Sequence, residues 1–158
     1  MYPRGHLTMR KLLLVGLIAA SLTAGRTVAA QAGISLGAAV GSSVHDGKLD
    51  SESLHGLLYL RLGFPLVPYG ARGDLIVFDA ADAGTEVALI GSAVMSISIP
   101  LIQPYVLAGF GRYGFSDGST NGISFGGGIR VGGRRGLFLE GRRHDPINRT
   151  MVSLGVAF

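Results

Sequence analysis

Residues 150–158 read TMVSLGVAF, and this stretch decides the fold. Large apolar side chains recur at every second position and alternate with smaller or more polar ones: Val152, Leu154, Val156 and Phe158 against Met151, Ser153, Gly155 and Ala157. A period of two is that of a β-strand, in which successive side chains point to opposite faces. The pattern indicates a strand with lipid on its apolar face and a crowded interior on the other.

The same alternation recurs in seven further stretches. The strands predicted from it cover residues 34–43, 54–64, 69–78, 86–99, 105–115, 122–131 and 137–144. Several approach the ~9–11 residues that a tilted strand needs to cross a bilayer. Together with residues 150–158 they make eight, an even number as in bacterial outer-membrane barrels. The predicted fold class is therefore all-β, an eight-stranded antiparallel up-and-down transmembrane β-barrel.

The connections between these strands alternate in kind. Those at 65–68, 100–104 and 132–136 are short and rich in Pro or Gly, residues typical of tight turns. The other connections are polar and cover residues 44–53, 79–85, 116–121 and 145–149. Consecutive connections of an up-and-down barrel lie at opposite ends. We therefore expect the tight turns and both termini at one end and the polar loops at the other.

Composition excludes several classes of function. The chain has 158 residues and no Cys, so it forms at most one domain, without disulfides or a Cys-built metal site. Its net charge of +4 arises entirely before Gln31, because the rest of the chain contains ten basic and ten acidic residues. A nucleic-acid-binding domain would carry its excess of basic residues on the folded part. We therefore expect no nucleic-acid partner.

The first 32 residues resemble a secretory leader. Met9 precedes Arg-Lys, then the apolar run LLLVGLIAASLTAG, and small residues at Ala30 and Ala32 flank Gln31. This order predicts a signal peptide over 1–32, with Met9 as an alternative start and cleavage after Ala30 or Ala32. The barrel domain then covers 33–158. A membrane anchor is the alternative, but the apolar run is shorter than the ~20 residues of a spanning helix.

Seven of the charged residues within the predicted strands are assigned to the face opposite the large apolar residues. They are Arg61, Arg72, Asp74, Arg112, Arg130, Glu140 and Arg142. An Arg on the lipid face at the membrane midplane costs about 2–4 kcal/mol. We therefore expect these residues, with Glu86, to form a charge network in the lumen, because buried charges persist only when paired or hydrated. A soluble lipocalin-like barrel would show the reverse pattern.

Several parts of the chain resemble the small outer-membrane β-barrels of Gram-negative-type bacteria, the OmpA-like and OmpX-like family. They are the leader, QPYVLAGFGRYGF at 103–115, FGGGIRVGGRRGLFLEGR at 125–142 and the terminal Phe158. The resemblance covers essentially all of the mature chain and implies a bacterial outer-membrane location. It also implies that Val152, Leu154, Val156 and Phe158 form a signal for the outer-membrane assembly machinery.

Barrels of this family carry aromatic girdles at both membrane interfaces. Trp is absent, so the girdles would consist of Phe and Tyr. We expect Phe64, Tyr69, Tyr105 and Phe158 at one rim and Phe78, Tyr113 and Phe115 at the other.

Motifs for chemistry are weak. GFGRYG at 109–114 matches a dinucleotide-binding fingerprint, but the following FSDGSTNG cannot form the helix that this site needs. His45, His55 and His144 are candidate bases or metal ligands, and Ser53 lies two residues from His55. His45 and His144 are expected to be solvated, near acidic residues. We expect no metal, no cofactor and no enzymatic activity.

A structural or surface-interaction role in the outer membrane is the function that this pattern favours. Eight strands enclose an interior that side chains about fill, so an open porin is not expected. The expected partners are membrane lipids, including lipopolysaccharide where present, and the assembly machinery, with the protein itself a monomer. The alternatives are a narrow small-solute channel and a lipid-modifying enzyme that would depend on His55 or His144.

Overall fold

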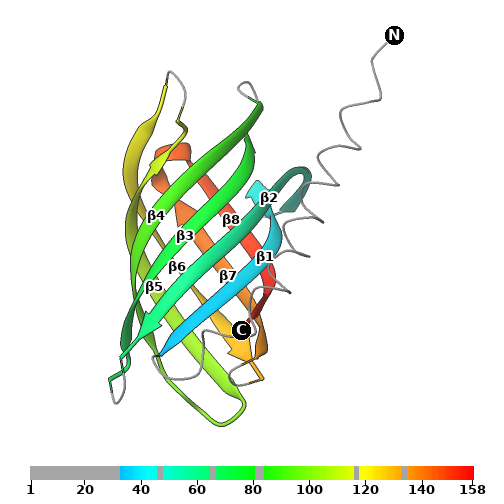
Figure 1. Cartoon of the computed structure of the whole chain (residues 1–158). Coiled ribbons are helices and arrows are strands. Elements are labelled where there is room, and N and C mark those ends of the chain that lie inside the picture. The colour runs from blue at the N-terminus through cyan, green and yellow to red at the C-terminus, as the bar shows by residue number, and fades with distance from the viewer. Residues whose placement is uncertain (1–32, 46–47, 65–66, 81–83, 116–117, 133–134) are drawn as a thin grey trace.

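Eight antiparallel strands close into a barrel (Figure 1). The computed structural model describes residues 33–158 except 46–47, 65–66, 81–83, 116–117 and 133–134, so the predicted leader lies outside the described residues. The strands are β1 (Ile34–His45), β2 (Lys48–Gly63), β3 (Tyr69–Ala80), β4 (Gly84–Ser96), β5 (Ile102–Tyr113), β6 (Thr120–Val131), β7 (Gly136–His144) and β8 (Arg149–Ala157). Each pairs with its neighbours in sequence, and β8 closes onto β1. The predicted fold class is confirmed.

Outside the strands, the described residues include one short helical turn. The 3₁₀ helix η1 (Asp145–Ile147) connects β7 to β8 and ends at Asn148 in the left-handed conformation, with φ 51°. No helix among the described residues is long and apolar enough to cross a membrane.

The two ends of the barrel differ as the sequence predicts. We call the end of the barrel at which β1, β3, β5 and β7 end the loop end. The opposite end, at which β2, β4 and β6 end, is the turn end. β1 begins and β8 ends at the turn end, at the bottom of Figure 1.

Two predicted connections are shorter than expected. The polar segment 44–53 is largely strand, because β1 continues to His45 and β2 already begins at Lys48, with a shift of register between Ser42 and Ser43. Backbone hydrogen bonds between strands do not require apolar side chains, so the pairing of β1 with β2 continues into their polar ends. The predicted turn at 100–104 is likewise shortened.

The turn between β4 and β5 consists of Pro100 and Leu101. Ile99 and Ile102 exchange two backbone hydrogen bonds of 3.1 Å across it. Pro104 therefore lies within β5, where its carbonyl accepts a hydrogen bond of 3.0 Å from the Ile97 N–H. Proline is tolerated there because it lies near the start of the strand.

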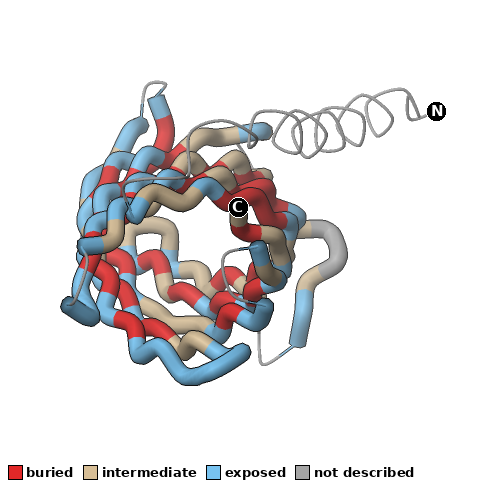
Figure 2. Tube along the Cα trace, turned by 60° about the horizontal axis from the view of Figure 1, so that its bottom comes forward, coloured by how far each residue is buried: buried red, intermediate tan, exposed pale blue. Residues whose placement is uncertain are grey.

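Apolar side chains form a belt on the outside of the barrel. Buried and exposed residues alternate along the strands, as the tube in Figure 2 shows. Exposed large residues occur on every strand and include Leu36, Leu60, Tyr69, Leu89, Val106, Ile129, Leu139 and Leu154. Buried charged residues point to the interior, among them Arg72, Asp74, Glu140 and Arg142. This is the reverse of the pattern of a soluble barrel.

The faces of β5 are reversed relative to the prediction. Val106 and Phe110 are exposed, whereas Tyr105, Leu107 and Tyr113 are buried. Arg112 shares the face of Val106 and Phe110 and is exposed. It therefore does not lie in the lumen.

Three aromatic residues assigned to the girdles lie inside the barrel. Phe78, Tyr105 and Tyr113 are all buried, and the two hydroxyl groups bond to Glu140 and His144. Buried Tyr is stable where its hydroxyl finds a partner. The large aromatic residues that are exposed are Phe64, Tyr69, Phe110, Phe115 and Phe125.

Inward glycines make room for these rings. Four large inward rings face a glycine directly across the ladder, in the pairs Gly37–Tyr59, Gly41–His55, Gly128–Tyr105 and Gly155–Phe138. A Cβ added at Gly37 would lie 2.2 Å from the Tyr59 ring, and one at Gly155 would lie 2.7 Å from the Phe138 ring. The high Gly content thus allows a narrow barrel to hold large aromatic side chains.

Candidate functional site

An ion-pair network crosses the lumen at its centre. Arg72 on β3 contacts Asp74 on the same strand and Glu140 on β7, with a second bond of 3.2 Å from Nη2 to Glu140 Oε1. Arg142, also on β7, donates from Nη1 to Asp74 Oδ2 at 2.8 Å. All four side chains are at most 3% exposed. We call these four residues the lumen network.

Neutral groups complete the lumen network. Arg142 Nη2 donates to the hydroxyls of Ser92 at 2.7 Å and Ser124 at 2.8 Å. Tyr105 donates to Glu140 Oε2 at 2.7 Å, and the Arg72 guanidinium lies 4.2 Å from the centre of the Tyr59 ring.

Two cations and two anions thus balance one another in the lumen network. Buried ion pairs persist when such additional bonds satisfy the remaining donors and acceptors. The arrangement fills and crosslinks the lumen.

The other predicted lumen residues lie elsewhere. Arg61 is partly buried towards the turn end and donates from Nη2 to Ser96 Oγ at 2.7 Å. Arg130 is buried on β6, and Glu86 is partly buried near the loop end of β4. Arg112, on the outer face, donates to Ser119 Oγ at 2.9 Å and lies 5.5 Å from the Phe115 ring. The described contacts therefore connect four of the eight predicted residues.

Two histidines are buried inside the barrel. His55 Nε2 lies 2.7 Å from Ser153 Oγ, and His144 Nδ1 lies 2.9 Å from the Tyr113 hydroxyl. The expectation that His144 is solvated is wrong, because it is 1% exposed. The His45 side chain lies outside the described residues.

Among the described residues, the His55–Ser153 contact lacks the third group that orients the imidazole of a catalytic pair. A Ser–His pair can activate a hydroxyl when a third group orients the imidazole. Nδ1 of His55 has no hydrogen-bond partner among the described residues. Ser53 bonds to Ser43 at 3.0 Å and to Arg149 at 3.3 Å. Within the described residues no group of three His, Cys, Asp or Glu side chains is arranged to hold a metal ion.

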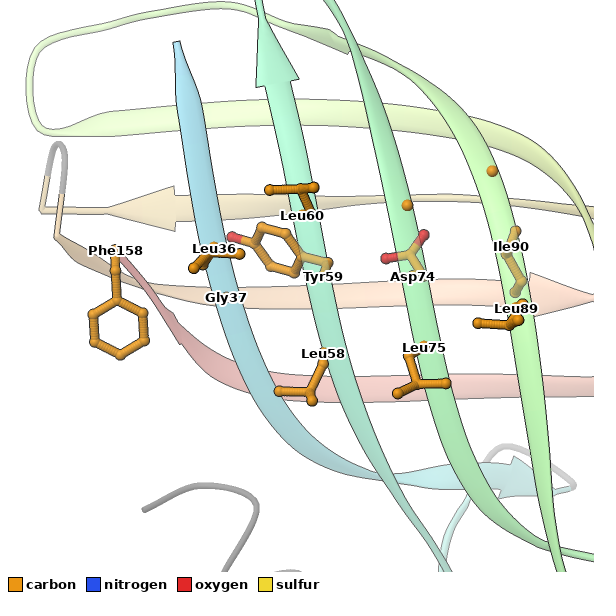
Figure 3. A pocket seen from close by; sticks show the side chains of 12 residues that line it. Leu36, Gly37, Leu58, Tyr59, Leu60, Asp74, Leu75, Leu89, Ile90 and Phe158 are labelled. Atoms are coloured by element: carbon orange, nitrogen blue, oxygen red, sulfur yellow. The ribbon is translucent and has the colours of Figure 1, made fainter. Parts of the chain in front are cut away.

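A shallow groove lies on the apolar exterior over β1–β4. It has a volume of about 560 Å³, and Figure 3 shows the leucine side chains of these strands around it. Gly73 and Gly91 are direct cross-strand partners there. A Cβ added to either glycine would meet nothing within 4 Å. The missing side chains therefore create the groove.

Filling this groove should stabilise the barrel. Gly91→Ala adds a methyl group in open space and removes the entropic cost of a strand glycine, so unfolding should become harder by about 0.5–1 kcal/mol. Gly126→Ala is the matched control, because its Cβ would lie 2.2 Å from the Gly141 carbonyl oxygen. The free energy of unfolding, measured with urea in lipid vesicles, should be higher for Gly91→Ala than for the parent and lower for Gly126→Ala. The opposite order would contradict the inward and outward assignment of β4 and β6.

Comparisons with known proteins identify the class of fold. No protein-family model matches the sequence, and no curated protein sequence matches it. A de novo designed transmembrane β-barrel is similar with a TM-score of 0.56 at 16% identity, over 82% of this chain and 97% of the design. Neisserial surface protein A matches with a TM-score of 0.51 at 13% identity, over 78% and 92%.

A further solved structure is the attachment invasion locus protein Ail of Yersinia pestis. It aligns with a TM-score of 0.48 at 19% identity, over 79% of this chain and 96% of Ail. The designed barrel and Neisserial surface protein A, the two structures with TM-scores above 0.5, each align over more than three quarters of this chain. This chain has the fold of the small eight-stranded transmembrane barrels.

Proposed function

We propose that this protein is an integral barrel of the bacterial outer membrane with a structural or surface-interaction role. The observation that carries the proposal is the reversed polarity of the fold, apolar outside and charged inside. An exposed apolar surface that extends around a whole barrel is unfavourable in water and favourable in lipid. In this orientation the loop end faces the cell surface and the turn end faces the periplasm.

The closing strand supports the same proposal. Leu154 is exposed on β8, and Val152 and Val156 share its face. With Phe158 they present one row of apolar groups beside the closing seam with β1. We propose that the outer-membrane assembly machinery recognises this row, and that membrane lipids surround the folded monomer.

The lumen network argues for a closed barrel. Its ion pairs link β3 to β7 across the interior, so an ion passing through would have to displace paired charges. Water and ions would then have to replace several hydrogen bonds at once. A sealed barrel leaves the loop end as the surface for contacts. A narrow channel is the competing function, and a conductance measurement distinguishes the two.

We expect no stepwise conductance from the purified, folded protein in planar lipid bilayers. Insertion is checked separately, by reconstituting the same preparation into vesicles and showing that the strands resist protease. Stepwise currents from the inserted parent protein would replace the closed-barrel proposal with the channel. Dependence of those currents on Arg72 and Glu140 would show that the lumen carries them.

A further inference from the structure

Charged side chains are unevenly distributed along the barrel axis. Near the loop end the described residues include both signs: Asp50, Asp79, Glu86 and Asp145 with Lys48, Arg112, Arg143 and Arg149. At the turn end the charged side chains that the structure describes are Arg61, Arg130 and Arg135. The sequence in and next to the three connections there, residues 64–68, 97–104 and 131–136, contains no Asp or Glu. The turn end is therefore cationic.

A pocket opens in this cationic end. It has a volume of about 480 Å³ and lies between the β2–β3 and β4–β5 connections. Its polar lining consists of Arg61, Ser96, Ser98 and Gln103, and Phe64 and Tyr69 contribute to its walls. None of the residues described around it carries a carboxylate. The pocket therefore presents hydrogen-bond donors beside a positive charge.

The polar groups of the pocket already converge. Arg61 Nη2 donates to Ser96 Oγ at 2.7 Å, and Gln103 Nε2 lies 3.4 Å from the same oxygen and 3.2 Å from Ser98 Oγ. A guanidinium has five N–H donors. The described contacts of Arg61 use one of its N–H groups, so the others can reach a ligand.

The surrounding charges strengthen the attraction for an anion. Arg72 is the direct cross-strand partner of Arg61, and Arg130 is that of Gln103. Both cations act electrostatically on Arg61. Asp74 and Glu140 lie deeper and are engaged by Arg72. A concave site lined by one sign of charge concentrates counter-ions, and an anion here would relieve the repulsion between like charges.

We propose that the turn-end pocket binds a small oxyanion, a phosphate or a carboxylate. The Arg61 guanidinium supplies paired N–H donors to two oxygen atoms, which is the geometry that arginine favours for such groups. The hydroxyls of Ser96 and Ser98 complete the coordination with their own O–H groups, and the Gln103 amide, which donates to both oxygens, holds them in place. The pocket lies on the aqueous side of the lumen network, so binding does not require a conducting lumen.

The test uses the folded protein in phosphatidylcholine nanodiscs, with ¹⁵N-labelled arginine side chains observed by NMR. Titration with inorganic phosphate should shift the Arg61 signal saturably, and chloride at equal ionic strength should not. Arg61→Gln should weaken phosphate binding, measured by calorimetry, about tenfold or more. Arg112→Gln is the matched control on the outer face and should leave the affinity within about twofold of the parent.

A second variant keeps the test decisive should Arg61→Gln fold poorly. Gln103→Glu retains the size of the side chain and places a carboxylate in the pocket, so it should abolish phosphate binding while Arg61 remains in place. Equal phosphate affinity in the parent, Arg61→Gln and Gln103→Glu proteins would overturn the proposal. A titration of the parent without saturation would also overturn it.

A lipid head group offers the same chemistry as free phosphate. Nanodiscs of phosphatidylglycerol, without added phosphate, distinguish the two sources. An Arg61 shift in these discs that free phosphate no longer changes would identify the lipid phosphate as the ligand. An Arg61 signal unchanged by the lipid but shifted by free phosphate would identify a soluble anion.

Discussion

Glu140→Gln should destabilise the barrel by up to about 3–5 kcal/mol, the scale for breaking a buried ion pair. Glu140 is 2% exposed and accepts hydrogen bonds from Arg72 and Tyr105. The amide has no charge, and its NH₂ group cannot accept a bond from either donor. Arg72 then keeps Asp74 as its carboxylate partner, so the loss reflects one broken pair. Far-UV circular dichroism during urea unfolding measures the effect, since Trp fluorescence is absent.

Asp145→Asn is the control for Glu140→Gln. Asp145 lies in η1, and its side chain is 46% exposed at 3.6 Å from Arg143 Nε. An exposed pair contributes about 0–1 kcal/mol. Added salt should screen the surface pair and leave the buried one largely unchanged. Equal effects of the two substitutions would show that Glu140 does not lie in a desolvated lumen.

The alternation of side chains is sufficient to predict most of the barrel. In β3, Arg72 and Asp74 alternate with Leu75 and Val77, so the inward face is unambiguous. In β8 the row that ends at Phe158 is equally distinct. In the middle of each of these two strands, the charged or hydroxyl side chains lie on one face only. The number of strands and their direction follow from these patterns and the turn residues between them.

In β5 the same argument fails, for a physical reason. Both faces carry large apolar groups, Tyr105 and Leu107 on one and Val106 and Phe110 on the other. Arg112 requires an inward position only if it lies at the membrane midplane. It lies one residue from the loop end of β5, and near the interface an outward Arg costs only about 0–1 kcal/mol. Depth within the membrane decides which face of β5 points inward, and the alternation of side chains does not reveal that depth.

Which residues of the candidate site contact one another also depends on how the strands are arranged in space. Arg72 and Glu140 are 68 residues apart, and His55 and Ser153 are 98 apart. Alternation predicts that each points inward, but which residues meet across the lumen depends on the tilt and stagger of the strands. The predicted network therefore contained the correct central residues without their pairing. The partner of His55 has no local signal in the sequence.

Leu154→Arg tests the outward face of the closing strand. Leu154 is 59% exposed, and its cross-strand partners are Val40 on β1 and Leu139 on β7. All three are exposed on the apolar belt. A charged side chain near the bilayer centre should destabilise the folded barrel by about 2–4 kcal/mol, measured by reversible unfolding into lipid vesicles.

Ser153 provides the contrast, one residue away and on the opposite face. It is buried and contacts His55, so Ser153→Arg should fail through overpacking of the interior rather than exposure to lipid. A nitroxide label at each position separates the two causes, because apolar oxygen collides with a label in lipid and rarely reaches one in a packed lumen. We expect high oxygen access at 154 and low access at 153. The reverse result would place against lipid the face of the sheet that carries the buried ion pairs, where such charges are unstable. The proposal that the barrel spans a membrane would then have to be abandoned.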